Sequence, residues 1–270
     1  MKKQPIGIFD SGVGGLTVLK ELVNTMPNEN YLYFGDTARI PYGEKTREQL
    51  FGYVRGILEW FKAKEVKAVV MACNSSSAVV YEAIKNEYDF PIFSLIEPTA
   101  QYISYVTAEK IGVLATSATV NSKAYTNAIK RISPSKEVFE VACPGLVEIV
   151  ESNKTDTYEA KKLVIKYVVP LLEKGAGNII LGCTHYPFLS HIICDVAKDR
   201  ELLIDPGKHL AEKVADSLLL TDILNTEGEG SVQFFASFNT LMFVEVGKRF
   251  FPAINDAEQL EIGEVINVIK

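Results

Sequence analysis

Two apolar stretches of this chain end in the same way, each in a cysteine followed by amide or hydroxyl side chains. Residues 179–187 read Ile-Ile-Leu-Gly-Cys-Thr-His-Tyr-Pro, and residues 68–75 read Ala-Val-Val-Met-Ala-Cys-Asn-Ser. A short apolar run that stops at polar residues is typical of a buried parallel strand, which delivers side chains to a site at its carboxyl end. We therefore expect Cys73 and Cys183 to lie at equivalent strand ends and to act as a pair.

The repeat extends upstream of both cysteines. Residues 6–11 read Ile-Gly-Ile-Phe-Asp-Ser, and residues 111–116 read Ile-Gly-Val-Leu-Ala-Thr, so that each apolar run ends in a hydroxyl. This pattern predicts an α/β fold class with two similar parallel-sheet α/β domains, related by pseudo-two-fold symmetry, and an active site in the cleft between them. The alternative is that any doubly wound protein repeats strands and turns in this way.

The same pattern predicts where the two domains begin and end. Residues 1–98 and 206–270 form the first domain, which contains Asp10 and Cys73, and residues 99–205 form the second. Within them we expect helices over residues 74–88 and after residue 119, a crossover at residues 96–99, and a strand at residues 232–236 by which the chain returns to the first domain.

Charge and hydropathy limit the partners of this chain. Its net charge of −6, with 47% hydrophobic and 23% charged residues, is that of a soluble globular protein and argues against a nucleic-acid partner. No apolar run approaches the roughly 20 residues that cross a bilayer, and residues 1–5 lack the features of a signal peptide. We expect a cytoplasmic protein without a membrane partner, whose thiols stay reduced.

The four cysteines form no Cys-x-x-Cys pair, which weakens a zinc or redox reading. Too few further ligands accompany Cys183 and His185 to hold a metal, so we expect neither a metal nor a cofactor. The glycine loop at residues 10–15 matches neither a P-loop nor a dinucleotide fingerprint, although its backbone N–H groups suit a small carboxylate.

Two cysteines that face each other across a cleft suit the inversion of a carbon that bears hydrogen. One group removes the proton from one face, and the other delivers a proton to the opposite face. A helix N-terminus lowers the pKa of a thiol, and we expect both thiols at such a position. Asp10 and His185 are candidate proton partners, although Asp10 could instead be a structural cap and His185 an ordinary buried histidine.

Four motifs carry a resemblance to a known family. They are Asp10-Ser-Gly-Val-Gly-Gly, Gly35-Asp-Thr-Ala-Arg-Ile-Pro-Tyr-Gly, Ala72-Cys-Asn and Leu181-Gly-Cys-Thr-His-Tyr-Pro. In order and spacing, over essentially the whole chain, they resemble the glutamate racemases of the cofactor-independent aspartate/glutamate racemase superfamily. The resemblance implies a two-domain isomerase that interconverts L- and D-glutamate without a cofactor and supplies D-glutamate for peptidoglycan.

The resemblance also implies roles for individual residues. Cys73 would act on the D-enantiomer and Cys183 on the L-enantiomer, with Asp10 and His185 assisting. It implies that glutamate is the small-molecule substrate and leaves a homodimer open. The residues implied to hold the substrate are Ser11, Pro41, Tyr42, Gly43, Asn74, Ser75, Thr116, Thr119, Glu151 and Thr184.

The chain departs from the family pattern at two places. The family usually has Asn-Thr-Ala-Ser after the first cysteine, where this chain has Asn-Ser-Ser-Ser at residues 74–77, and Gly145 lies where the family has Leu after Cys-Pro. Ser75, Ser76 and Gly145 therefore bear on the substrate range. Three alternatives stay open: a racemase of aspartate or another amino acid, a non-catalytic amino-acid-binding protein, and a thiol peroxidase or redox sensor.

Overall fold

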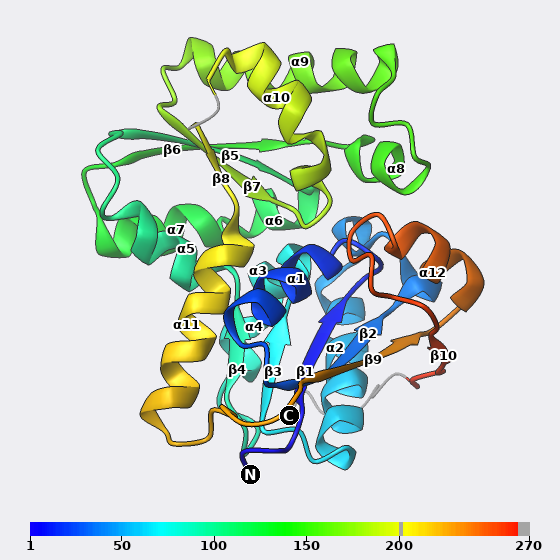
Figure 1. The fold of residues 1–270 in the computed structure, drawn as a ribbon. Coiled ribbons are helices and arrows are strands. Elements are labelled where there is room, and N and C mark those ends of the chain that lie inside the picture. The colour runs from blue at the N-terminus through cyan, green and yellow to red at the C-terminus, as the bar shows by residue number, and fades with distance from the viewer. Residues whose placement is uncertain (200–201, 264–270) are drawn as a thin grey trace.

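Two separate parallel sheets organise the chain in a computed structural model that describes residues 1–199 and 202–263 (Figure 1). The larger sheet has the strand order β10-β9-β2-β1-β3-β4, and the smaller has the order β6-β5-β7-β8. The strands of the larger sheet are β1 (Ile6–Asp10), β2 (Asn30–Gly35), β3 (Ala68–Met71), β4 (Ile92–Ser94), β9 (Ser231–Ala236) and β10 (Glu258–Gln259). Those of the smaller sheet are β5 (Lys110–Ala115), β6 (Glu137–Ala142), β7 (Asn178–Gly182) and β8 (Leu203–Ile204).

The first four strands of each sheet are arranged in the same way. In both sheets the first strand along the chain lies between the second and the third, and the fourth lies beyond the third. β1 is thus equivalent to β5, and β3 to β7, so Cys73 and Cys183 follow equivalent strands. The predicted α/β class with two similar parallel sheets is confirmed.

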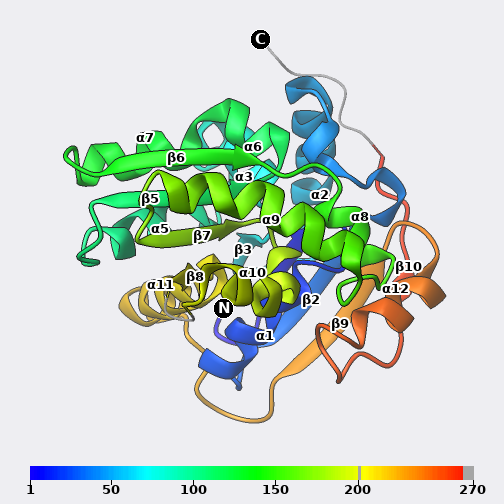
Figure 2. The same cartoon turned by 90° about the horizontal axis from the view of Figure 1, so that it is seen from above.

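Helices cover both faces of each sheet (Figures 1 and 2). α1, α11 and α12 pack on one face of the larger sheet and α2 on the other, while α8, α9 and α10 cover one face of the smaller sheet, and α5 and α7 the other. The helices are α1 (Leu16–Thr25), α2 (Arg47–Ala63), α3 (Asn74–Val79), α4 (Tyr81–Ile84), α5 (Ile96–Ile103), α6 (Ser117–Ser122), α7 (Ala124–Ile132), α8 (Leu146–Glu151), α9 (Tyr158–Glu173), α10 (Ser190–Ala197), α11 (Pro206–Leu220) and α12 (Thr240–Gly247).

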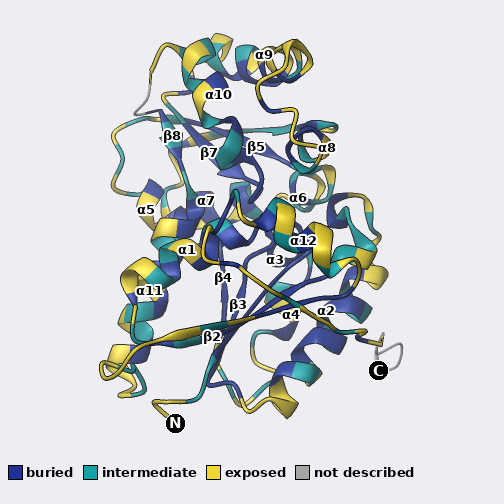
Figure 3. Ribbon diagram, turned by 45° about the vertical axis from the view of Figure 1, so that its right-hand side comes forward, coloured by how far each residue is buried: buried dark blue, intermediate teal, exposed yellow. Residues whose placement is uncertain are grey.

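Period-two burial along the strands explains these layers. Ile6 and Ile8 of β1 point to the α1 side of the sheet, whereas Phe9 points to the α2 side. All five residues of β1 are buried, as a strand covered on both faces requires. Figure 3 shows the central strands of the sheets buried inside helices whose outer surfaces are exposed.

The chain returns to the larger sheet after leaving the smaller one. β9 pairs in parallel with β2, and α11 packs against both α1 and α5. The domain limits at residues 98 and 206 stay a prediction, and residues 200–201 and 264–270 of those domains lie outside the described residues. In the described part of the chain, no helix combines the length and the apolar character needed to cross a membrane.

Three predicted elements need correction. The helix expected over residues 74–88 is two short helices, α3 and α4, which meet at Val80, where two consecutive β-branched residues disfavour a continuous helix. The crossover expected at residues 96–99 does lie between β4 of the larger sheet and β5 of the smaller, but it is the first turn of α5, in which a proline at residue 98 is tolerated. The helix expected after Thr119 begins already at Ser117, because the Thr116 hydroxyl accepts the N–H of Thr119 as an N-cap.

Candidate active site

The first thiol lies between the end of β3 and the start of α3. Cys73 is only 5% exposed, and the backbone N–H groups of Ser75 and Ser76 point toward its sulfur. Burial and the charge of Asp10 nevertheless raise the pKa of the Cys73 thiol to about 12. The predicted lowering of this pKa by the helix N-terminus is therefore wrong, because desolvation outweighs two backbone N–H groups.

Asp10 ends β1 beside this thiol and is fully buried. Its carboxylate accepts the backbone N–H of Gly12 at 2.9 Å and the hydroxyl of Thr184 at 3.2 Å. Burial raises the pKa of Asp10, while nearby His185 opposes that rise. Asp10 thus connects the Cys73 side of the site with residues that follow the other cysteine.

The second thiol has an imidazole partner. Cys183 Sγ lies 3.7 Å from His185 Nδ1, and His185 Nε2 lies 2.6 Å from Oε1 of Glu151. Burial by itself lowers the pKa of His185, but the bonds to Cys183 and Glu151 raise it well above its usual range. Cys183 precedes a 3-10 turn at residues 186–189 rather than an α-helix, so the expected helix N-terminus is wrong here too.

Two hydrogen bonds join the carboxyl ends of the two sheets in equivalent ways. Thr184, next to Cys183, donates to Asp10 at the end of β1. Ser75, two residues after Cys73, lies with its Oγ 2.9 Å from Oγ1 of Thr116 at the end of β5. Thr116 Oγ1 lies 3.1 Å from the hydroxyl of buried Thr119. Both sheets therefore meet at the edge where the two cysteines lie.

Glycines permit this close approach at two loops. A Cβ atom at Gly14 would lie 2.5 Å from Thr184 Oγ1, and a Cβ atom at Gly43 would lie 2.7 Å from Thr116 Cβ. Real Cβ atoms do not approach so closely, so a side chain at either position would push the two halves apart. The glycine loop before α1 accordingly packs against the second half of the molecule.

The loop after β2 lines the site on the side of the larger sheet. The Tyr42 hydroxyl donates to Asp36 Oδ2 at 2.6 Å, and Arg39 pairs with the same carboxylate. Pro41, which follows a cis peptide bond, and Gly43 line a small cleft of about 40 Å³. Further lining of this cleft comes from Thr116, Cys143, Pro144, Gly145 and Tyr186.

The remaining predicted residues also lie here. Ser11 is buried directly after Asp10, and Asn74 directly after Cys73. Glu151, which the resemblance placed among the residues that hold the substrate, lies against His185 in the structure.

The sequence motifs miss three buried tyrosines at this site. Tyr33 donates to the carbonyl of Gly12 at 2.8 Å, and Tyr125 donates to Oδ1 of Asn74 at 2.7 Å. Tyr186 is fully buried, and burial together with nearby Cys183 raises the pKa of its phenol well above the usual range. Their pattern in the sequence is that of core residues, and the one available signal is that a buried tyrosine hydroxyl needs a hydrogen-bond partner.

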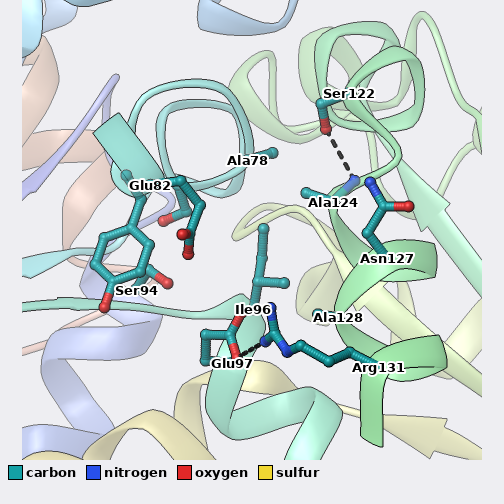
Figure 4. Close-up of a pocket in the computed structure, with 12 residues that line it drawn as sticks. Ala78, Glu82, Ser94, Ile96, Glu97, Ser122, Ala124, Asn127, Ala128 and Arg131 are labelled. Carbon is teal, nitrogen blue, oxygen red and sulfur yellow. Dashed lines mark hydrogen bonds and ion pairs between the residues drawn. The ribbon is translucent and has the colours of Figure 1, made fainter. Parts of the chain in front are cut away.

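A larger cavity of about 180 Å³ lies away from both thiols (Figure 4). Its wall includes Ser94, Ile96 and Glu97 on one side and Ala128 and Arg131 of α7 on the other. Glu97 pairs with Arg131 at the cavity wall. Among the described residues, no three His, Cys, Asp or Glu side chains gather as a metal site would require.

Comparisons with known proteins agree with this geometry. The family model described as Asp/Glu/Hydantoin racemase matches residues 6–214. A glutamate racemase of Picosynechococcus sp. is 38% identical over 98% of this chain and 95% of its own length. The crystal structure of glutamate racemase isoform RacE1 from Bacillus anthracis superposes with a TM-score of 0.93 at 30% identity, over 97% of this chain and 98% of that one. A glutamate racemase from Francisella tularensis, solved with D-glutamate, gives a TM-score of 0.89 at 32% identity, over 97% and 98%.

Proposed function

The chain belongs to the Asp/Glu/Hydantoin racemase family, a family of isomerases, and we propose that it interconverts L- and D-glutamate by proton transfer between two thiols. The observation that carries this proposal is the arrangement of Cys73 beside Asp10 and of Cys183 beside His185 at two sheet edges that hydrogen bonds hold together. A protein that only binds an amino acid needs neither thiol, and the two proton partners favour catalysis over binding.

In the direction from L-glutamate, the Cys183 thiolate removes the proton from Cα and becomes a thiol. His185, held between Cys183 and Glu151, stabilises the thiolate before the transfer. Cys73 then donates its own proton to the opposite face of the carbanion and becomes a thiolate. In the return direction the two cysteines exchange roles, so no other reactant is needed to balance the protons.

The protonation of Cys73 suits its half of this reaction. A thiol with a pKa near 12 keeps its proton at neutral pH until a strongly basic carbanion forms beside it. The charge of Asp10 acts on Cys73, and Asp10 is proposed to receive that thiol's proton when the direction reverses; burial raises the pKa of Asp10 itself. When L-glutamate enters, Cys73 is thus the proposed acid and Cys183 the proposed base.

Polar groups around the thiols are proposed to hold the ammonium and carboxylate groups of the substrate. They come from both halves of the molecule, so a bound substrate bridges the two sheet edges. The proposed set is Ser11, Pro41, Tyr42, Gly43, Asn74, Ser75, Thr116, Thr119 and Thr184. We propose further that the D-glutamate product supplies peptidoglycan, that the protein acts in the cytoplasm, where its thiols stay reduced, and that it could pair as a homodimer.

The source of the new α-hydrogen tests the two-thiol mechanism. In D₂O, D-glutamate formed early from L-glutamate should carry deuterium at Cα in nearly every molecule, because Cys73 has exchanged with solvent, while unreacted L-glutamate stays largely protiated. Mass spectrometry before the back reaction mixes the pools measures this. Early product that retains substantial α-protium would show that a single base serves both faces of Cα. If circular dichroism shows no racemisation of L-glutamate, the proposed function itself is overturned.

A further inference from the structure

Tyr125 connects the core of one half of the molecule to the site in the other. It belongs to α7, and its ring is fully buried against the face of the smaller sheet that α5 and α7 cover. Its hydroxyl leaves this apolar cluster and donates to Oδ1 of Asn74, the first residue of α3, at 2.7 Å. Asn74 directly follows Cys73 and is only 3% exposed.

At this bond the Asn74 carboxamide has one of its two possible orientations. An asparagine side chain has one accepting oxygen and one nitrogen with two N–H donors, and rotation by half a turn exchanges them. The Tyr125 hydroxyl occupies the oxygen, so the nitrogen lies on the other side. Within the described residues, the Asn74 Nδ2 atom makes no hydrogen bond to the protein.

We propose that Tyr125 is a positioning residue that holds the Asn74 carboxamide with its N–H donors toward the substrate, where they bind a carboxylate. The inference rests on the proposed function, because it assumes that a dicarboxylate enters the site beside Cys73. Of the charged groups of glutamate, only a carboxylate can accept these donors, whereas the opposite orientation would present an oxygen and suit the ammonium group.

Two features make Tyr125 suited to this task. Burial raises the pKa of Tyr125, so its hydroxyl keeps its proton at neutral pH. The phenol also comes from the half of the molecule that carries Cys183, so it reaches Asn74 only while the two halves are in contact. The orientation of the donor is therefore tied to the closed arrangement of the site.

Tyr125→Phe removes one hydroxyl and keeps the ring in the core. Without this bond the Asn74 carboxamide is no longer held in one orientation. We therefore expect KM for both enantiomers to rise about tenfold. The kcat should change little, because the contact between the Asn74 N–H donors and the carboxylate binds the substrate and the transition state alike. The matched control is Tyr31→Phe, which removes another buried hydroxyl that donates to Leu22 and Met26 carbonyls in the larger sheet's layer. This control should keep the wild-type KM.

A double-mutant cycle separates positioning from a general loss of packing. If Tyr125 acts through Asn74, then Tyr125→Phe in an Asn74→Ala background should raise KM no further. A tenfold rise that persists in this background would overturn the proposal, and so would a wild-type KM in the single Tyr125→Phe variant.

Asn74→Asp gives a second test that leaves Tyr125 untouched. The aspartate still accepts from the Tyr125 hydroxyl but has no N–H donor, so KM should rise at least as much as in Tyr125→Phe. A wild-type KM would overturn the assigned orientation.

If the wild-type protein does not racemise glutamate, the proposed function fails. The same variants are then compared by calorimetric Kd for D-glutamate, with the same expected order and the same contrary outcomes.

Discussion

The surroundings of the two cysteines differ although their places in the fold are equivalent. Each follows the third strand of its sheet, and each lies near a hydroxyl contact to the other half. Two residues after Cys183 the chain has His185, whereas two residues after Cys73 it has Ser75. The imidazole contacts the Cys183 sulfur, while Cys73 has backbone N–H groups and the buried carboxylate of Asp10.

This difference shows how a duplicated framework can serve an asymmetric task. The strand order fixes where each sulfur lies, and the neighbouring side chain determines whether it holds a proton. The His185 imidazole, whose pKa the bonds to Cys183 and Glu151 raise, contacts the Cys183 sulfur, whereas burial and the charge of Asp10 raise the pKa of the Cys73 thiol. The proposed two-thiol mechanism needs one protonated and one deprotonated group at the start of each turnover, and the unlike surroundings of the two cysteines favour that difference.

Removing either sulfur breaks the comparison most severely. Cys73→Ala and Cys183→Ala should each lower racemisation by about 1,000-fold or more in both directions, because one thiol cannot serve both faces of Cα. Polarimetric or circular-dichroism assays from each enantiomer measure this. Cys143→Ala and Cys194→Ala are matched controls that should remain active, and full activity in either of the first two variants would contradict the assignment of the bases.

Weakening the imidazolium sharpens the comparison. Glu151→Gln removes a carboxylate that raises the pKa of His185, so the imidazolium should lose its proton at lower pH. The alkaline limb of the pH–kcat profile for L-glutamate should therefore move to lower pH, with about a tenfold loss of kcat on that limb. Glu159→Gln, an exposed carboxylate at the start of α9, is the control, and an unmoved limb in Glu151→Gln would count against this role.

Asp10 gives the corresponding test on the other side. Because burial raises the pKa of Asp10 in the folded state, its stabilising contribution is fully present below the unfolded pKa and is lost as pH rises through the folded pKa. Asp10→Asn should thus raise Tm by a few degrees near neutral pH while lowering activity. Scanning calorimetry from pH 4 to 8 should show the gain shrinking toward acid, and a gain that grows toward acid would contradict the sign.

The smallest effect is expected from the contact between Ser75 and Thr116. Ser75→Ala leaves the Thr116 hydroxyl its contact with Thr119 and removes one hydrogen bond of about 1 kcal/mol between the two halves. Tm should fall by about 2 to 4 °C. Ser122→Ala, which removes a hydroxyl that donates to the Thr119 carbonyl within α6, is the control. The KM for glutamate should rise in Ser75→Ala and stay at the wild-type value in Ser122→Ala.

Local patterns were enough to locate most strands and the polar residues at their ends. Ile6–Asp10 and Asn178–Gly182 are apolar runs bounded by turn formers, and a capping box between Thr46 and Gln49 starts α2. The break at Val80 was less predictable, because helix propensities differ little over so short a segment. Periodicity and capping act between neighbours in the chain, so the sequence displays them directly.

The sequence alone thus determined two similar α/β halves and the pair of cysteines at their strand ends. Only the tertiary structure decided that Glu151 meets His185 and that Tyr125 meets Asn74, because these partners are 34 and 51 residues apart and no local pattern joins them. It also decided the protonation of Cys73. A helix N-terminus is visible in a sequence, but the desolvation that outweighs it depends on how completely the folded chain buries the thiol.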